Sequence, residues 1–405
     1  MTTILDRYSS SLMNTYGPPK RVLVRGEGCY VWDEQGRRYL DLMAGIAVNV
    51  LGHAHPAVIA AVTEQLSTLG HVSNLFASPA QVALADRLLA ILGSGSGDRD
   101  GDGSDGGRVF FTNSGTEANE AAFKMSRRTG RTTIVSAEGA FHGRTMGALA
   151  LTGKGAYREP FRPLPGDVRF VPYGDAAALA AAVDDETAAI LLEPIQGEAG
   201  VIVPPADYLS NARDIADRHG TLLWLDEIQT GIGRTGRWFA HQHAGVRPDI
   251  VTLAKGLAGG IPIGACIGLG DAGRLLGPGQ HGSTFGGNPV AAAAGLAVLD
   301  TIESEGLLEH AAVIGHQLRS ALTGSHPAIE RVDGAGLLLG IQLYGPLSGR
   351  AARLALDAGY IVNDVTPTRL RLAPPLILSQ DQADAAVHAI PGILDRATRA
   401  AEEDS

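Results

Sequence analysis

Two short apolar runs that each end in a carboxylate constrain this fold more than any other feature of the sequence. Residues 188–193 read Ala-Ala-Ile-Leu-Leu-Glu, and residues 221–226 read Thr-Leu-Leu-Trp-Leu-Asp. Neither run alternates apolar with polar residues, as a strand with one solvated face would. Between the runs, the apolar residues of Pro204–His219 share one helical face, and Gly220 follows as a helix C-cap. Such strands, separated by a helix, predict a parallel sheet covered on both faces.

The alternation of strands and helices continues on both sides of these runs, and it changes after about residue 300. Further strands are predicted within 108–113, 132–136 and 168–173, and helices at about 114–128, 307–322 and 379–401. A hairpin is expected within 28–42, and β-rich runs at 336–343, 359–363 and 369–377. We therefore predict an α/β chain in three parts, an N-terminal segment (1–60) packed with a small domain, a large domain (61–300) and a small α+β domain (301–405).

Composition excludes several classes of protein. The 405 residues carry a formal net charge of −10 without a basic run, so nucleic acid is not expected as a partner. The longest apolar run, Val290–Leu299, is too short to cross a membrane, and no signal peptide is visible, so a soluble cytoplasmic protein is expected. The two cysteines, Cys29 and Cys266, are expected to be reduced and buried. A Gly/Asp-rich surface loop is predicted at 93–107.

Lys255 ends the strand-like run Val251-Thr-Leu-Ala-Lys255, which is an unusual place for a lysine. One interpretation is that its ammonium reaches solvent along the strand end. The other is that the amine stays in a pocket for covalent chemistry with a carbonyl group. Glu193 and Asp226 end neighbouring strands, and the carboxyl ends of parallel strands form the ligand site in such sheets.

The segment Asn113–Glu120 follows a predicted strand and carries the spacing of a helix start. Ser114 and Glu117 stand three residues apart, as in a capping box. Gly115 would let backbone N–H groups face a ligand, Thr116 would add a hydroxyl, and the helix dipole favours an anion there. An ordinary helix cap without a ligand is the alternative interpretation.

Three further residues complete a set with one chemistry in common. A buried Asp226 needs a cation, such as a protonated ring nitrogen. Gln229 can donate an amide N–H to a phenolate oxygen, and Phe141 can stack on a flat ring. Pyridoxal phosphate has an aldehyde for the lysine, a cation for the aspartate, an anion for the helix and a face for the phenylalanine.

Over essentially its whole length the sequence resembles the class III (subgroup II) pyridoxal-phosphate aminotransferases of fold type I, and within them most closely the acetylornithine aminotransferases. The motifs that carry the resemblance lie at 45–56, 113–124, 140–145, 193–200, 225–236, 253–265, 281–289 and 370–377. The resemblance implies a large domain with a mostly parallel seven-stranded sheet, a smaller α+β domain, and a homodimer with shared active sites.

The resemblance assigns the cofactor to Gly115, Thr116, Phe141, Asp226, Gln229, Lys255 and Thr284. Lys255 would hold the cofactor's aldehyde covalently and later shuttle a proton. Asp226 would keep the ring nitrogen protonated. Gly115 and Thr116 would hold the phosphate, together with Thr284 from the other subunit of the dimer.

For the substrates, the resemblance implies that Arg144 binds a carboxylate with Ser283 nearby, and that Arg371 binds the α-carboxylate of glutamate. Glu198 would pair with Arg371 while the other substrate is bound. This division is physically reasonable because one site must accept two unlike amines in turn, and a planar guanidinium suits each carboxylate.

The expected reaction is the transfer of the terminal amino group of N2-acetyl-L-ornithine to 2-oxoglutarate in arginine biosynthesis, yielding N-acetylglutamate 5-semialdehyde and glutamate. Ornithine, succinyldiaminopimelate and 4-aminobutyrate are alternative amine donors, and a mutase, a racemase or a cofactor-binding protein without transamination are alternatives on the same scaffold. No metal is expected. The pairs His53/His55 and His241/His243 are interpreted as packing residues, and Gly231–Gly236 as a turn.

Overall fold

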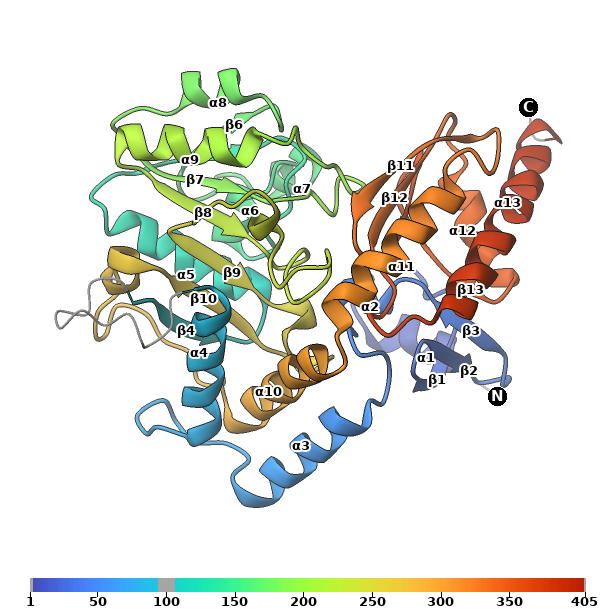
Figure 1. Cartoon of the computed structure of the whole chain (residues 1–405), viewed down its shortest axis with the longest axis horizontal. Helices are drawn as coiled ribbons and strands as arrows, with labels where there is room; N and C mark the ends of the chain where they lie inside the picture. The colour runs from blue at the N-terminus through green and yellow to red at the C-terminus, as the bar shows by residue number, and fades with distance from the viewer. Residues whose placement is uncertain (1–2, 94–105, 404–405) are drawn as a thin grey trace.

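The computed structural model describes residues 3–93 and 106–403, and it forms two lobes (Figure 1). A seven-stranded sheet runs through the larger lobe, and among its described strands β10 alone runs in the direction opposite to the others. In spatial order the strands are β4 (Arg108–Thr112), β10 (Gly264–Gly268), β9 (Ile250–Leu253), β8 (Leu222–Asp226), β7 (Thr187–Leu192), β5 (Thr133–Ala137) and β6 (Asp167–Val171). The predicted α/β architecture with a mostly parallel sheet is confirmed.

Helices cover both faces of this sheet, which explains the apolar runs without alternation. Neighbouring residues of β7 point to opposite faces. Leu191 packs in a cluster with α5 (Gly115–Arg127), whereas Ile190 packs in a different cluster with α9 (Tyr208–His219). α9 ends at Gly220, which has φ +58° as the predicted C-cap. A strand with both faces buried needs apolar residues at every position, so the sequence pattern predicted this layer correctly.

The strand β10 was not predicted from the sequence, because its residues Gly-Ala-Cys-Ile-Gly have weak strand propensity. Its first glycine is required by packing. A Cβ at Gly264 would lie 2.4 Å from the backbone oxygen of Ser114. Cys266, in the middle of the strand, and Cys29 are both buried free thiols, as expected.

The smaller lobe contains a four-stranded antiparallel sheet in the order β11 (Ile329–Ala335), β12 (Leu338–Leu343), β15 (Arg369–Leu372), β14 (Asn363–Thr366). Its helices are α11 (Leu307–Leu322), α12 (Ser348–Asp357) and α13 (Gln380–Glu403). The sequence predicted α11 and α13 closely, but it did not predict β11 or α12. β11 mixes buried and exposed residues and contains three charged residues, so its apolar signal is weak.

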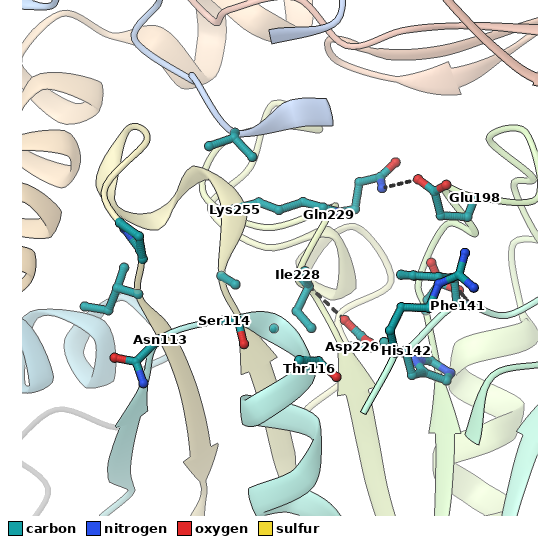
Figure 2. Close-up of a pocket in the computed structure, with 18 of the residues that line it drawn as sticks. Asn113, Ser114, Thr116, Phe141, His142, Glu198, Asp226, Ile228, Gln229 and Lys255 are labelled. Atoms are coloured by element: carbon teal, nitrogen blue, oxygen red, sulfur yellow. Dashed lines mark hydrogen bonds and ion pairs between the residues drawn. The ribbon is translucent and has the colours of Figure 1, made fainter. Parts of the chain in front are cut away.

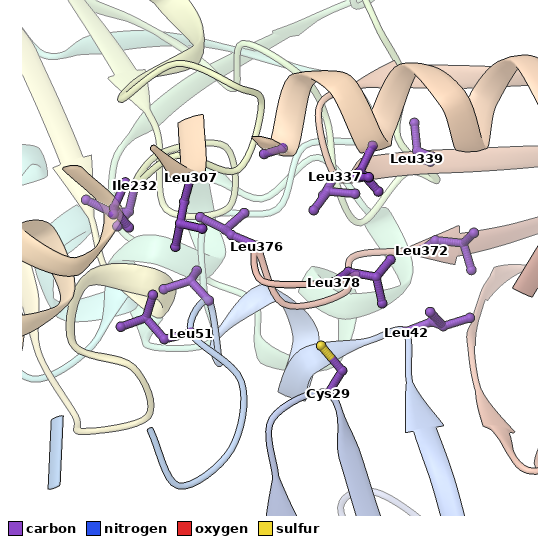
Figure 3. Packing of buried hydrophobic residues seen from close by; sticks show 14 of the residues in the cluster. Cys29, Leu42, Leu51, Ile232, Leu307, Leu337, Leu339, Leu372, Leu376 and Leu378 are labelled. Carbon is purple, nitrogen blue, oxygen red and sulfur yellow. The ribbon is translucent and has the colours of Figure 1, made fainter. Parts of the chain in front are cut away.

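The N-terminal segment joins the smaller lobe through a second four-stranded sheet. The predicted hairpin forms β2 (Tyr30–Asp33) and β3 (Arg38–Asp41), next to β1 (Leu23–Glu27). The C-terminal strand β13 (Tyr360–Ile361) pairs with β3 in parallel. Figure 3 shows how Cys29 and Leu42 of this segment pack with Leu372 and Leu378 in one apolar cluster. The same cluster continues into the larger lobe at Ile232 (Figure 3).

The helices that connect the two lobes lie near the predicted domain boundaries. Residue 60 falls within α3 (Pro56–Thr68) and residue 300 within α10 (Pro289–Ser304), and these two helices pack against each other. The division into 1–60, 61–300 and 301–405 therefore remains a prediction.

The remaining helices are α1 (Ile4–Ser11), α2 (Ala44–Ala47), α4 (Pro79–Ile91), α6 (Met146–Leu151), α7 (Gly155–Arg158) and α8 (Ala176–Ala182). In the part of the chain that the structure describes, no helix is both long and apolar enough to cross a membrane. Most of the predicted Gly/Asp-rich loop at 93–107 lies outside the described residues.

Candidate active site

The carboxyl edge of the large sheet places Lys255 beside a cavity. β9 ends at Leu253, and Lys255 begins the short 3-10 helix η3 (Lys255–Ala258) with φ +39°. A non-glycine residue in this left-handed region is strained, which is common at functional sites. Figure 2 shows the side chain crossing the pocket toward Gln229. Burial disfavours the charged ammonium and lowers the pKa of Lys255, so the neutral amine is more accessible than in water.

Asp226 ends β8 and is held by three donors from the same lobe. Its Oδ2 accepts hydrogen bonds from Nδ1 of His142 at 2.7 Å and from Nδ2 of Asn119 at 2.9 Å. Its Oδ1 accepts the backbone N–H of Ile228 at 3.0 Å (Figure 2). The carboxylate is only 3% exposed. These contacts fix its orientation, and it can hold a proton on a ring nitrogen placed in the cavity.

The N-terminus of α5 forms the anion-binding end of the cavity. Ser114 caps the helix by accepting the N–H of Glu117 at 3.3 Å. The predicted capping box forms only in part, because Glu117 accepts from the backbone N–H and side-chain amide of Asn113 rather than from Ser114. A Cβ at Gly115 would lie 2.6 Å from Cδ1 of Ile228, so a larger residue here would require that side chain to shift. The hydroxyl of Thr116 lies 2.8 Å from that of Thr145.

Phe141 and Glu193 form another part of the cavity wall. The backbone N–H of Phe141 donates to Glu193 Oε1 at 2.9 Å, and the N–H of Gly197 donates to Oε2 at 3.2 Å. Burial raises the pKa of Glu193 to about 7, even though both N–H groups and the nearby His142 favour its ionised form. The Phe141 ring is left facing the cavity, where it can stack on a planar ligand.

Arg144 lies at the rim of the cavity and is exposed. Its guanidinium lies 3.7 Å from the ring centroid of Tyr157 and 5.5 Å from that of Phe141. These contacts orient a planar group that offers two parallel donors to a carboxylate.

A charged group at the cavity wall combines residues from both lobes. Arg371 of β15 donates through Nη1 to Glu198 at 2.5 Å and to Oε1 of Gln229 at 2.8 Å. Its Nε and Nη2 both donate to Oδ1 of Asn363. Burial opposes ionisation of Glu198, but the charges of Arg371 and Lys255 outweigh it and lower the pKa of Glu198. Gln229 is thus engaged with this ion pair, donating to Glu198 at 3.4 Å.

The cavity has a volume of about 370 Å³, and most of the residues predicted for the site line it. The predicted lining residues are Gly115, Thr116, Phe141, Arg144, Glu198, Asp226, Gln229 and Lys255. Arg371 is not among the lining residues, but it donates a hydrogen bond to Glu198, which is. Ser283 and Thr284 are not among the lining residues. Ser283 accepts a hydrogen bond from Asn113 at 3.3 Å, and Thr284 is exposed.

The arrangement fits pyridoxal phosphate at its aldehyde, its ring nitrogen, its phosphate and its ring face. An amine with a lowered pKa, a fixed carboxylate, a helix N-terminus and an aromatic face surround one cavity. The N-terminus of α5 offers backbone N–H groups that can bind an anion. No group of His, Cys, Asp and Glu in the described residues could hold a metal ion. His53 contacts Asp41 instead, and His241 contacts Glu227.

Sequence reasoning missed several residues of this site. Asn119 and Asn363 were not identified, although each contacts a key charge. A signal for Asn119 existed, because it is a polar residue on the buried, Ala-rich face of α5. Glu193 was placed at the sheet edge but given no contact.

Comparisons with known proteins agree with this geometry. The family model described as Aminotransferase class-III matches residues 12–394. An acetylornithine aminotransferase from Mycobacterium tuberculosis is 59% identical over 399 residues, covering 98% of each chain. One from Streptomyces coelicolor is 56% identical over 403 residues, covering 99% of this chain and 98% of the relative.

Solved structures share the fold over nearly the whole chain. Ornithine aminotransferase from Toxoplasma gondii, whose structure reveals partial occupancy of PLP at its active site, gives a TM-score of 0.89 at 31% identity, covering 97% of this chain and 94% of the other. N-acetylornithine aminotransferase from Stenotrophomonas maltophilia gives a TM-score of 0.81 at 33% identity, covering 96% and 99%. With a family match across most of its length and a cavity that fits the cofactor, this chain belongs to the class III aminotransferases and is a pyridoxal-phosphate-dependent enzyme.

Proposed function

We propose that this enzyme transfers the terminal amino group of N2-acetyl-L-ornithine to 2-oxoglutarate in arginine biosynthesis, and that it acts in the cytoplasm. The observation that carries the proposal is the ion pair of Glu198 and Arg371 at the wall of the cavity, together with a second arginine, Arg144, that lines the same cavity and has no acidic partner among the described residues. Two arginines can each bind a substrate carboxylate, and Glu198 can neutralise one of them when no substrate carboxylate is present. This suits two substrates of which only one has a carboxylate next to the reacting amine. The acetylornithine aminotransferases that are 56–59% identical support the choice of amine.

At the cofactor end, Lys255 is proposed to carry the cofactor and to move a proton at the reacting carbon. The bound cofactor supplies an electron sink for the carbanion that proton removal creates. Asp226 keeps a proton on the ring nitrogen, and His142 and Asn119 hold that carboxylate in place. Gly115 and Thr116 bind the phosphate at the helix N-terminus, and Phe141 supports the ring.

At the substrate end, glutamate is proposed to use both arginines. Its α-carboxylate displaces Glu198 from Arg371, while Arg144 binds its side-chain carboxylate, with Ser283 nearby. Gln229 must then exchange its bond with Arg371 for one with the cofactor's ring oxygen. N-acetylornithine has no carboxylate beside its terminal amine. Glu198 therefore keeps Arg371 neutralised, and Arg144 alone anchors the distant α-carboxylate.

A homodimer with shared sites is part of this proposal. Thr284 is assigned to the phosphate site of the other subunit. It lies in an exposed segment beside Phe285, whose ring is 5.2 Å from that of His71. Leu75 and Phe76 are 86% and 67% exposed, and the neighbouring Asn74 bonds to the backbone of residues 283 and 286. Exposed apolar side chains around this segment favour an interface.

The function is tested by the two half-reactions measured separately. Purified enzyme is mixed with glutamate, N-acetylornithine, ornithine, succinyldiaminopimelate or 4-aminobutyrate, and the change in cofactor absorbance is followed in a single turnover. Glutamate and N-acetylornithine are expected to react fastest. Ornithine is the second candidate, because ornithine aminotransferases are close structural matches, but at 31% identity they support it less. Faster reaction with ornithine than with N-acetylornithine would overturn the proposed substrate.

A mixing experiment tests the shared site. Lys255→Ala and Thr284→Ala variants, each expected to have low activity alone, are unfolded, mixed and refolded together. A mixed dimer carries one site free of both changes only if Thr284 serves the other subunit's site. Recovery of activity in the mixture is therefore expected, and its absence alongside a dimeric mass would contradict the assignment of Thr284.

A further inference from the structure

The strand β15 presents two buried arginines to the same loop of the larger lobe. Arg369 and Arg371 are two residues apart in a strand, so their side chains leave the sheet on one face. They are 4% and 2% exposed. Arg371 contacts the carboxylate of Glu198, as described above. Arg369 contacts the backbone of the same loop, donating through Nη1 to the carbonyl oxygens of Gly200 at 2.8 Å and Val201 at 3.3 Å.

The loop that carries Glu198 is short and strained. Residues 196 and 202 pair through two backbone hydrogen bonds, and these bonds close a tight loop over residues 197–201. Val201 is fully buried and has φ +62°, a left-handed conformation that a β-branched residue rarely adopts. Such a conformation persists only where the surroundings enforce it.

The small-lobe sheet is shaped to receive this loop. Gly340 of β12 lies opposite Arg371 in the sheet, and a Cβ there would lie 2.5 Å from the oxygen of Gly200. A Cβ at Gly200, which has φ +109°, would in turn lie 2.5 Å from Cδ of Arg369. The backbone of the loop at Gly200 therefore lies directly against β12 at Gly340, with the Arg369 side chain packed beside it. Arg369 fills the remaining contact and satisfies two carbonyl groups at the base of the loop.

Arg369 is itself held on its other side. Its Nε donates to Gln342 at 2.6 Å, and its Nη2 lies 3.2 Å from Asp333. Arg331 is half-exposed and also pairs with Asp333, at 2.9 Å, but no described contact joins it to the loop. The guanidinium of Arg369 therefore bridges the sheet of one lobe and the loop backbone of the other, while its charge stays compensated.

From these contacts we infer that Arg369 is a positioning residue for substrate exchange. It holds the backbone of the 197–201 loop against β15. The Glu198 side chain can then leave and rejoin Arg371 while the backbone of Glu198 stays in place. The inference rests on the proposed function, in which Glu198 neutralises Arg371 for one substrate and not for the other. The two arginines thus divide the work. Arg369 holds the loop, and Arg371 exchanges partners.

The clamp has unequal consequences for the two substrates. N-acetylornithine reacts while Glu198 neutralises Arg371, so it depends on the carboxylate returning to one position. Glutamate reacts with Glu198 displaced, so a loosened loop affects it less. Loss of the clamp is expected to impair the N-acetylornithine half-reaction selectively.

The test uses Arg369→Met, which keeps an unbranched stem as far as the position of Nε and removes every donor. In single-turnover measurements we expect the rate constant divided by the dissociation constant to fall about 10- to 100-fold for N-acetylornithine, as loss of hydrogen bonds from a charged donor would produce, and by less than about threefold for glutamate. Arg331→Met is the matched control, because it removes the other cation from Asp333 without touching the loop, and it should leave both half-reactions near wild type. If Arg369→Met does not fold, Arg369→Lys takes its place. Lysine keeps a buried positive charge near Asp333 but lacks the planar guanidinium, so we expect the same selective loss for N-acetylornithine relative to glutamate, with a smaller magnitude.

A double-mutant cycle separates positioning from general loosening. Glu198→Gln should already impair N-acetylornithine, and adding Arg369→Met should cause little further loss, because both changes act on the same carboxylate. Equal losses for both substrates, or fully additive effects, would overturn the inference and indicate a structural role alone. If the wild type reacts with glutamate but not with N-acetylornithine, the proposed substrate is wrong, and the same ratio is then measured with whichever terminal amine reacts.

Discussion

The two ends of the cavity differ in how their charges are held. At the cofactor end, Asp226 contacts His142, Asn119 and the backbone of Ile228, all within the larger lobe. At the substrate end, the ion pair joins Glu198 of the larger lobe to Arg371 of the smaller one. The first set of contacts is local to one core, whereas the second crosses between lobes.

This difference matches what each end has to do. A cofactor that stays in place through both half-reactions benefits from groups with fixed orientation, because preorganised dipoles need no rearrangement during reaction. A site that accepts two unlike substrates in turn needs a charge that can be covered and uncovered. Removing a group of fixed orientation should therefore slow the half-reactions of both substrates. Removing a group that changes partners should slow one half-reaction more than the other.

The largest effect is expected at the fixed end, for Lys255→Ala. Turnover should fall by at least about a thousandfold with both amines, because the lysine serves as covalent anchor and as proton carrier. Lys20→Ala is the control, since Lys20 is exposed and 3.6 Å from its partner Asp364. Borohydride reduction followed by peptide mass mapping should find the cofactor on Lys255. A cofactor fixed to another lysine would contradict the assignment.

The next effect is expected for Asp226→Asn, which keeps the shape of the side chain. The cofactor should remain bound, but kcat should fall about a hundredfold or more for both substrates, because an amide no longer favours a protonated ring nitrogen. Cofactor absorbance and steady-state kinetics measure the two outcomes. Asp271→Asn, an exposed carboxylate remote from the cavity, should change neither. Near-native turnover of Asp226→Asn would contradict the proposed role of Asp226 in keeping the ring nitrogen protonated.

At the exchangeable end, Arg371→Ala should separate the substrates. We expect a loss of about 2 to 5 kcal/mol in transition-state stabilisation for glutamate and a clearly smaller loss for N-acetylornithine. Removing the arginine also leaves Glu198 without its cation, which should disturb both modestly. Arg144→Ala should impair both half-reactions, because each substrate uses that anchor. Equal losses for Arg371→Ala would show that the exchange does not occur here.

The sequence predicted the fixed end better than the exchangeable end, for a physical reason. Strand ends and helix starts are local patterns, so the positions of Asp226, Lys255 and Gly115 followed from apolar runs and a capping signal. The parallel order of the sheet followed for the same reason. β10 and β11 lacked a local signal, since one is glycine-bounded and the other is rich in charge.

Contacts that join distant segments could not be read from local patterns. Nothing near Arg369 in the sequence indicates that its side chain reaches the carbonyl of Gly200, 169 residues away. The pairing of Asn119 with Asp226 likewise depends on how α5 packs against the sheet. The pairing of Arg371 with Glu198 was expected only through resemblance to a family. Family resemblance thus provided what local physical chemistry alone could not.

The smallest effect is expected for Glu193, a group at the fixed end whose pKa is determined mainly by its burial. Its pKa is raised to about 7 in the folded state, whereas an unfolded glutamate titrates near 4.5. Between these values the folded protein binds more protons than the unfolded chain, so this group makes the free energy of unfolding fall as pH rises from about 4.5 to 7, by a few kcal/mol at most. Glu193→Gln removes the titration but keeps an oxygen to accept the N–H of Phe141. As the pH rises from about 4.5 to 7, the free energy of unfolding of the variant should therefore increase relative to that of the wild type. Above this range the difference should stay constant. Denaturant unfolding at closely spaced pH values measures the difference, and a constant difference from pH 4.5 to 8 would show that Glu193 titrates normally and that burial is not its dominant influence.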